Sequence, residues 1–248
     1  MRIAGIQRNS FVDYPGRLAA VFFTPGCNWR CFYCHNHALL GPQSGRPWLD
    51  LQTALTWLDG RRGWLDAVVI TGGEPTLQPD LAEFIRTVRA KGFLVKLDTN
   101  GTRPDVLRAL LNQKLLDFVA MDLKAPIEKY EAFCGVPIDH RALNESIDLL
   151  MANGIDYEFR TTVAPQLTQD DLRAIAARIR GARCYVLQQF RRPEGVENDP
   201  RLDVPTHEAA WAWPLIPELE TIVERCETRG FDLSASEAVN GAPLAPAV

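Results

Sequence analysis

The chain has 248 residues, of which 46% are hydrophobic and 23% charged, and its formal net charge is −4 at pH 7. This is ordinary globular composition, and the length suits one α/β domain with a large core. No run reaches the roughly 18 apolar residues of a membrane helix, and the mild negative charge argues against a nucleic-acid binder. Six cysteines without a secretory segment favour a reducing, cytoplasmic setting, with neither membrane nor nucleic acid as partner.

Strand-like runs rich in Val, Ile, Leu and Phe alternate along the chain with stretches of helical periodicity. The runs cover residues 17–26, 66–73, 93–101, 116–124, 156–165 and 183–190. Helices with one apolar face are expected over 81–88, 143–150, 172–179 and 219–226. Six consecutive βα units predict a parallel sheet that either lies open or curls into a partial barrel.

Three cysteines follow the first strand with the spacing C-x3-C-x2-C: Cys27, Cys31 and Cys34. Thiolates so close together can wrap one metal centre, and because a [4Fe-4S] cluster normally takes four cysteines, three leave one iron open. A zinc site completed by His35 or His37 is an alternative, but zinc ligands usually come as two short clusters. The other cysteines are isolated and are interpreted as small buried hydrophobic residues, namely Cys134, Cys184 and Cys226.

Unusual polar motifs stand where the expected strands end. Thr71-Gly72-Gly73-Glu74-Pro75 closes the second strand, and its glycines allow close backbone approach to a ligand. The later strands end in DTNG, MDLK, residues 160–165 and LQQF. Because ligands of parallel sheets bind at the carboxyl ends of the strands, these motifs are expected around a single site.

These motifs together carry a family resemblance. CNWRCFYCHN followed by GGEP resembles the radical S-adenosylmethionine (SAM) superfamily. More narrowly, RNSFVDYPGRLAAVFFTPGCNWRCFYCHN, VVITGGEPTLQPDL, LDTNG, AMDLKAP and YEFRTTVAP resemble activating enzymes of glycyl radical proteins. The likeness is nearest to the longer type of anaerobic ribonucleoside-triphosphate reductase activating protein and runs from about residue 5 to 192. It implies a partial (β/α)6 TIM-like barrel with parallel strands in a single domain over 1–248, with a core over about 17–190 and a helical closure over about 205–240.

The resemblance implies cofactors and the residues that would bind them. Cys27, Cys31 and Cys34 would ligate three irons of a [4Fe-4S] cluster, and SAM would chelate the fourth. Asp98, Thr99 and Asp122 are similar to residues that place a monovalent cation beside the SAM carboxylate. The full set expected around SAM is Tyr33, His35, Asn36, Gly72, Gly73, Glu74, Asp98, Thr99, Asp122, Lys124 and Arg160.

The implied reaction is reductive cleavage of SAM to methionine and a 5′-deoxyadenosyl radical, with a reduced flavodoxin or a ferredoxin-like protein as electron donor. The radical then removes a Cα hydrogen from a glycine of a partner glycyl radical enzyme. Asp13 and Tyr14, within residues 10–16, are expected at the mouth of the barrel where the partner's loop enters. No general acid or base is required.

Other readings remain open from the sequence. One is a radical SAM enzyme that acts on a small molecule, similar to 7-carboxy-7-deazaguanine synthase, and another is an activase of a different partner such as pyruvate formate-lyase. A third is a non-enzymatic iron–sulfur or zinc module. The region after 193 carries Trp211 and Trp213, which would bind a partner if exposed and close the barrel if buried.

Overall fold

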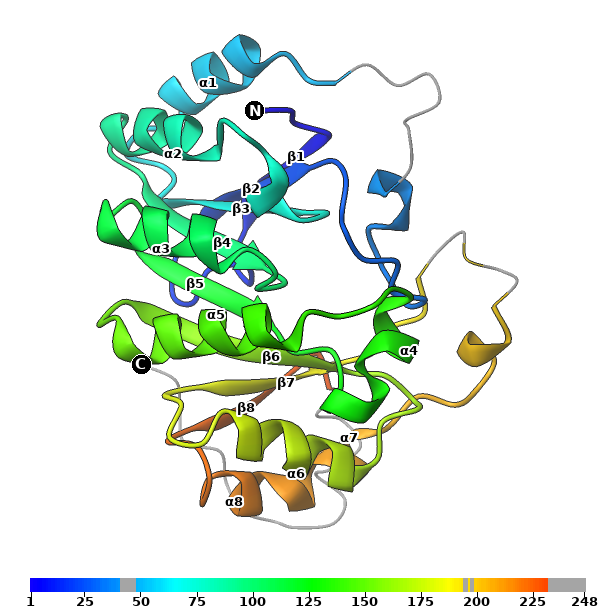
Figure 1. The fold of residues 1–248 in the computed structure, drawn as a ribbon. Helices are drawn as coiled ribbons and strands as arrows, with labels where there is room; N and C mark the ends of the chain where they lie inside the picture. Colours follow the sequence, from blue (N-terminus) through cyan, green and yellow to red (C-terminus); the bar gives the residue numbers. More distant parts are fainter. Residues whose placement is uncertain (41–47, 194–195, 197–198, 232–248) are drawn as a thin grey trace, which may run out of the picture.

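The computed structural model describes residues 1–40, 48–193, 196 and 199–231. Within these residues, eight strands form one sheet in the sequential order β1 to β8 (Figure 1). The strands are β1 (Gly5–Ser10), β2 (Ala19–Thr24), β3 (Ala67–Gly72), β4 (Leu94–Thr99), β5 (Phe118–Asp122), β6 (Asp156–Val163), β7 (Tyr185–Gln189) and β8 (Cys226–Arg229). Only β1 runs antiparallel to its neighbour within this sheet.

The predicted fold class is confirmed: β2 to β7 coincide with the six expected runs, and they pair in parallel as an open, partial barrel. Two strands were not predicted. The edge strand β1, of sequence GIQRNS, is mostly exposed and lacks an apolar alternation that would indicate a strand. The last strand, β8, has four residues and pairs with β7 through Tyr185 and Cys226.

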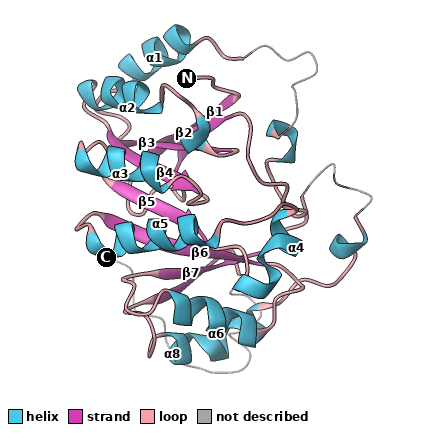
Figure 2. Cartoon of the chain, in the orientation of Figure 1, coloured by secondary structure: helices cyan, strands magenta, loops and turns pink. Residues whose placement is uncertain are grey.

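Most of the helices follow the strands and lie in a row along one side of the sheet, whereas α4 lies apart from them (Figure 2). They pack because their apolar residues recur at helical spacing, as in α2, where Leu81, Phe84, Ile85 and Val88 are all buried. The helices are α1 (Leu51–Asp59), α2 (Leu81–Ala90), α3 (Pro104–Asn112), α4 (Tyr130–Cys134), α5 (His140–Ala152), α6 (Gln169–Arg178), α7 (Ala209–Ala212) and α8 (Ile216–Leu219). Short 3-10 turns span His37–Leu39, Pro75–Leu77, Ile127–Lys129, Pro200–Leu202 and Trp213–Leu215.

The two faces of the sheet differ in chemistry because successive side chains point to opposite sides. One face carries Phe22, Ile70 and Leu97, which join the helices in the main hydrophobic core. Burying each such side chain contributes about 1.5–3 kcal/mol. The opposite, inner face carries charged residues such as Lys96 and Asp98, two positions apart on β4. A polar cavity is therefore built on the face that the helices leave free.

The prediction of a helix over 219–226 is wrong. Helix α8 ends at Leu219, and β8 begins at Cys226. The apolar residues between them have helical spacing, but they reach the core from a turn. The main-chain pairing of Cys226 with Tyr185 then makes the end of this segment a strand. Trp211 and Trp213 are partly buried against the main core, in accord with closing the barrel. The end of the predicted closure, beyond residue 231, lies outside the described residues.

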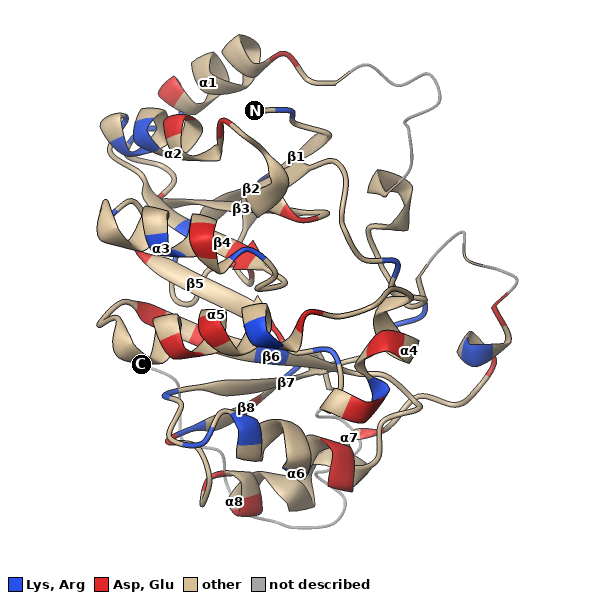
Figure 3. Ribbon diagram, in the orientation of Figure 1, with Lys and Arg blue, Asp and Glu red and all other residues tan. Residues whose placement is uncertain are grey.

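Acidic and basic side chains are interspersed over helices α2, α3 and α6 (Figure 3). The net charge of the whole chain is −4, and charges of both signs occur on this side of the molecule. Among the described residues, no helix has the length and apolar character to cross a membrane.

Candidate functional site

A pocket of about 340 Å³ lies on the inner face, at the carboxyl ends of the strands. It brings together the cysteine loop after β2 and the polar motifs after β3, β4, β5 and β6. Every residue predicted to bind the cluster or SAM lines it, and so does Asp13. Its wall comprises Asp13, Val21, Phe23, Cys27, Trp29, Cys31, Tyr33, Cys34, His35, Asn36, Leu40, Thr71, Gly72, Gly73, Glu74, Asp98, Thr99, Asn100, Asp122, Lys124, Arg160, Thr162 and Gln188.

The cysteine loop is folded back on itself and tied to the end of β3. The amide of Gly26 donates to the carbonyl of Leu39 (2.8 Å), which closes the loop at its base. The side-chain amide of Asn36 donates to the carbonyl of Gly72 (2.8 Å), which joins this loop to the GGEP turn. Asn36 was expected beside SAM, and the structure adds this bridging contact to its position in the pocket wall.

The three thiols of the loop differ in electrostatic surroundings. Burial raises the pKa of Cys27 to about 11 and also raises the pKa of Cys34. A hydrogen bond with the Cys134 thiol, assisted by the positive charge of Lys124, lowers the pKa of Cys31 to about 7 against the effect of burial. These two contacts favour the thiolate form of Cys31, the form that metal binding requires.

Cys134 was interpreted as an isolated, buried hydrophobic residue. It is fully buried at the end of α4, yet it lies beside the cysteine loop, and its carbonyl accepts a hydrogen bond from the amide of Arg30 (2.7 Å). About a hundred residues of sequence separate it from that loop, so no spacing pattern could indicate the contact. In the described part of the chain, no three His, Cys, Asp or Glu side chains converge as ligands of a single ion do. A [4Fe-4S] cluster makes no such demand, because each cysteine binds its own iron.

Both glycines of the GGEP turn are required by close backbone approach. Gly72 has a φ of +119°, and a Cβ there would lie 2.4 Å from backbone atoms of Thr24. A Cβ on Gly73 would lie 2.0 Å from the carbonyl oxygen of Gly26, one residue before Cys27. The amide of Gly73 donates to the Thr24 carbonyl (2.8 Å), so the two strand ends are held in contact.

We expect Gly73→Ala to force the cysteine loop away from β3 and to destabilise the fold by about 1–3 kcal/mol, as overpacking does. Thermal unfolding measures the loss, and SAM binding to the reconstituted protein measures displacement of the loop. Gly154→Ala is the matched control, since nothing lies within 4 Å of a Cβ at that position. Equal effects of the two substitutions would contradict the assignment of Gly73.

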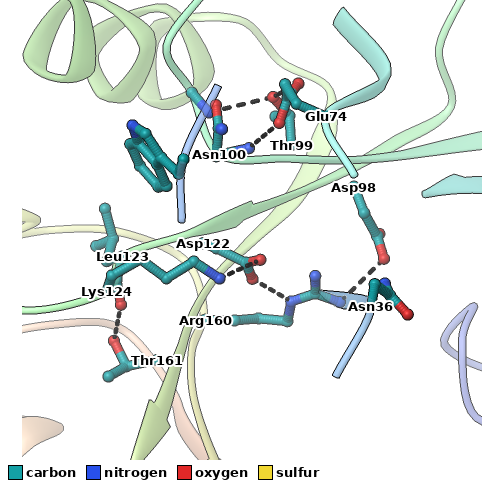
Figure 4. A network of polar contacts seen from close by, with 12 residues as sticks. Asn36, Glu74, Asp98, Thr99, Asn100, Asp122, Leu123, Lys124, Arg160 and Thr161 are labelled. Atoms are coloured by element: carbon teal, nitrogen blue, oxygen red, sulfur yellow. Dashed lines mark hydrogen bonds and ion pairs between the residues drawn. The ribbon is translucent and has the colours of Figure 1, made fainter. Parts of the chain in front are cut away.

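Glu74 is fully buried and joins the ends of β3 and β4 (Figure 4). Its Oε1 accepts from the amide of Thr76 (3.1 Å) and the hydroxyl of Thr99 (2.7 Å), while Oε2 accepts from the amide of Asn100 (2.7 Å). Burial nevertheless raises the pKa of Glu74 above the usual value. Such a carboxylate favours a cationic partner, and Oε2 retains a free lone pair for one. Asn100 was not predicted as a site residue, although it belongs to the DTNG motif.

Four charged side chains form a second network deeper in the pocket (Figure 4). Arg160 donates from Nε to Asp122 Oδ1 (3.0 Å) and from Nη1 to Asp98 Oδ2 (3.3 Å). Lys124 donates from Nζ to Asp122 Oδ2 (2.9 Å). Each cation therefore has an anionic partner within the protein; Lys124 follows the end of β5, whereas Arg160 lies within β6 opposite Asp122.

Asp122 should make the acid stability of the protein depend on this network. Burial alone would raise the pKa of Asp122, but the charges of Arg160 and Lys124 outweigh it and lower the pKa to about 2. A folded pKa below the unfolded value stabilises the protein above about pH 4, and this contribution is lost as the pH falls toward 2.

We therefore expect Asp122→Asn to cost about 2 kcal/mol at neutral pH and progressively less as the pH falls toward 2. Denaturant unfolding at a series of pH values measures this difference. Asp105→Asn is the control, because Asp105 forms an exposed pair with Arg103 and should cost at most about 1 kcal/mol. A cost for Asp122→Asn that does not shrink in acid would contradict the shifted pKa.

Two aromatic residues of the cysteine motif take different positions. Tyr33 is buried, packs edge-on against Phe32 and Phe133, and its hydroxyl has no hydrogen-bond partner within the described residues. His35 is exposed at the edge of the pocket, and partial burial of its ring lowers its pKa. Both side chains border the space where the adenine of SAM was expected.

Of the two residues predicted to meet a partner's loop, only Asp13 lines the pocket. Tyr14 lies outside the pocket wall. Its side chain is buried in a small apolar cluster with Val21 and Val69 and packs on Phe118 with ring centroids 5.6 Å apart. An apolar ring followed by Pro15 and Gly16 indicates a turn at the surface, but the sheet offers an apolar floor that this ring covers. Tyr14 therefore anchors this segment to the sheet.

Comparison with known proteins identifies the family. The model of the radical SAM superfamily matches residues 21–179, well over half of the chain. The chain belongs to the radical SAM superfamily. Membership implies a [4Fe-4S] cluster and SAM as cofactors of this radical SAM enzyme, and the matched segment contains every residue predicted to bind the cluster or SAM.

Relatives of this radical SAM enzyme include proteins with different assigned activities. A Methanocaldococcus jannaschii protein assigned as a glycyl-radical enzyme activating enzyme is 37% identical over 79% of this chain and 83% of its own length. The pyruvate formate-lyase-activating enzyme of Clostridium pasteurianum is 28% identical over 73% of this chain and 77% of its length. The 7-carboxy-7-deazaguanine synthase of Methanopyrus kandleri is 37% identical, but over only 41% of this chain and 47% of its length.

Solved structures support the fold of this radical SAM enzyme. Streptococcus suis SuiB bound to S-adenosylmethionine superposes with a TM-score of 0.66 at 12% identity, covering 91% of this chain and 55% of SuiB. At this identity the likeness concerns the fold alone.

Proposed function

We propose that this protein is an activase that installs a glycyl radical on a partner enzyme. The observation that carries the proposal is the single pocket in which the three loop cysteines meet the strand-end residues that suit SAM. Its volume of about 340 Å³ is within the range of small-molecule sites. The M. jannaschii relative supports the activase class, because its likeness extends over 83% of that protein.

The cofactors would be held from opposite sides of the pocket. Each of the three irons would be bound by one cysteine: Cys27, Cys31 or Cys34. The positive charge of Lys124 would stabilise these thiolates, and together with the Cys134 thiol it lowers the pKa of Cys31. When bound and reduced, the cluster and SAM supply reductive cleavage of the sulfonium and abstraction of a hydrogen atom. The protein's task is to orient these groups and exclude water.

The protein side chains would hold SAM by complementary charge. Glu74, whose Oε2 retains a lone pair, would accept from the SAM ammonium, with Gly72 and Gly73 leaving room for its approach. Arg160 and Lys124 would fix the position of the SAM carboxylate end. Asp98, Thr99 and Asp122 would place a monovalent cation, and Tyr33, His35 and Asn36 would border the adenine and cluster.

The proposed partner is anaerobic ribonucleoside-triphosphate reductase, and the proposed electron donor is a reduced flavodoxin or a ferredoxin-like protein. The deciding experiment mixes the anaerobically reconstituted, reduced protein and SAM with candidate glycyl radical enzymes. An electron paramagnetic resonance doublet of a glycyl radical on the reductase is expected. A doublet only on pyruvate formate-lyase would reassign the partner, and SAM cleavage without any protein radical would overturn the proposal.

A small-molecule substrate is the second candidate. Thr162 and Gln188 add two polar side chains to the pocket wall beyond those assigned to SAM. The relative named as a 7-carboxy-7-deazaguanine synthase shares 37% identity with this chain over 47% of its own length. Analysis of the 5′-deoxyadenosine product separates the two candidates. With a partner protein whose glycine is deuterated at Cα, an activase transfers deuterium to 5′-deoxyadenosine, and without that partner it does not.

A further inference from the structure

Lys96 lies in the middle of β4 with its entire side chain buried. A lysine is almost never fully buried unless its charge is paired, because removing an ammonium from water is costly. The sequence alternation of β4 directs Lys96 to the same inner face as Asp98. It belongs to none of the motifs expected around SAM, and it does not line the cofactor pocket.

The ammonium of Lys96 contacts groups from three separate parts of the chain. It donates a hydrogen bond to the main-chain carbonyl of Asp13. It also lies 3.3 Å from Asp98 Oδ1 and 3.8 Å from Glu158 Oε1. The ammonium is thus paired with two buried carboxylates, and an apolar residue here would leave them without this cation and the Asp13 carbonyl without this donor.

The segment that Lys96 holds is residues 10–16, which we call the 10–16 loop. Its own contacts already shape it, since the amides of Val12 (3.3 Å) and Asp13 (3.2 Å) both donate to Ser10 Oγ. The ring of Tyr14 is buried below it, against Phe118. These contacts define the form of the loop, and the bond to Lys96 ties it to the charged floor of the inner face.

This loop presents apolar side chains to solvent beside the pocket. Phe11 is 79% exposed and Val12 is 74% exposed, whereas the next residue, Asp13, lines the pocket wall. Because Phe11 and Val12 are not buried within this chain, their side chains do not stabilise its fold. Their exposure on a segment anchored at both Tyr14 and Asp13 is the pattern of a contact surface at the pocket mouth.

We propose that Lys96 is a positioning residue that fixes the 10–16 loop at the pocket mouth, so that Asp13 and the exposed Phe11–Val12 pair receive the glycine-bearing segment of a protein partner. This inference rests on the proposed function. The same ammonium contacts Asp98, which also accepts a hydrogen bond from Arg160. Lys96 therefore fixes the position of the loop relative to Asp98 and Arg160. The partner's glycine is thereby placed relative to the site where SAM is expected, and small misplacement is costly for such chemistry.

The test compares Lys96→Met with wild type as reconstituted holoproteins. Hydrogen exchange of amides in residues 10–17 should accelerate by about tenfold, because the tether is lost. The partner concentration that gives half-maximal radical formation should rise by about tenfold, while SAM cleavage without the partner stays within about twofold. Lys91→Met is the matched control, since Lys91 pairs with Asp59 at the surface end of α2.

A second variant guards against loss of folding. The double variant Lys96→Met, Glu158→Gln removes one of the carboxylates that the single substitution leaves without its cation. It should show the same faster hydrogen exchange in residues 10–17, the same weaker response to the partner and the same nearly unchanged SAM cleavage. A merely structural Lys96 would instead lower both activities in parallel, which would overturn the inference. Unchanged exchange in residues 10–17 would also overturn it, whatever the partner. Absence of any protein radical with the wild type would overturn the proposed function, and with it the partner's part of this inference.

Discussion

Replacing Cys31 with alanine is expected to leave the reconstituted protein without a [4Fe-4S] cluster and to lower SAM cleavage by about a hundredfold or more. Mutating a residue that only supports a metal ligand already lowers metal affinity or activity by up to about a hundredfold. Cys31 is the loop thiol whose pKa is lowered, to about 7, by its hydrogen bond with Cys134 and the charge of Lys124. Alanine at Cys27 or Cys34 should have the same outcome, because each would bind its own iron.

Iron and sulfide content, together with the electron paramagnetic resonance signal of the reduced cluster with and without SAM, measure the effect. Cys226→Ala is a control at a buried cysteine outside the pocket wall and should retain the cluster. Cys134→Ala provides the sharper comparison. Cys134 lies beside Cys31 but does not line the pocket, so its loss should leave the cluster assembled. Loss of the cluster in Cys134→Ala would identify a fourth cysteine ligand and remove the open iron on which the assignment depends.

The sequence predicted the parts of this molecule that depend on local pattern. Buried parallel strands read as apolar runs, which is why β2 to β7 were found, and the cofactor motifs lie where these strands end. Gly73 is also explained by its motif, because the 2.0 Å approach of the Gly26 carbonyl oxygen to a Cβ leaves no room for a side chain. Such features are encoded within a few residues of one another.

Contacts between distant segments were not predictable in the same way. Cys134 has no cysteine nearby in sequence, and its proximity to Cys31 arises only when α4 packs against the cysteine loop. Tyr14 reads as part of an exposed turn, yet the apolar floor formed by Val21, Val69 and Phe118 buries it. A single lysine in an apolar strand gave no signal of its role either, because Asp13 and Glu158 meet Lys96 only through the curvature of the sheet.

Arg160→Met is expected to destabilise the protein by about 3–5 kcal/mol, as breaking a buried ion pair from one side does. Arg160 is the cation common to Asp98, at 3.3 Å, and Asp122, at 3.0 Å, and it lies 3.9 Å from Glu158. Without it Lys96 and Lys124 still pair with these carboxylates, but no cation bridges Asp98 to Asp122. Denaturant unfolding measures the loss. Arg173→Met is the matched control, because its pairs with Asp170 and Glu218 are at the surface and should be worth at most about 1 kcal/mol.

The same substitution should lower SAM cleavage by about a hundredfold in whatever fraction of the protein remains folded, since a displacement of about 1 Å costs that much. Arg160→Lys separates the two effects. Lysine restores the charge and most of the stability, but it cannot bridge Asp98 and Asp122 with the planar fork of a guanidinium. Stability near wild type combined with weakened SAM cleavage is therefore the expected result for Arg160→Lys. Full activity in that variant would mean that only the charge of Arg160 matters, and that the fork between Asp98 and Asp122 does not position SAM.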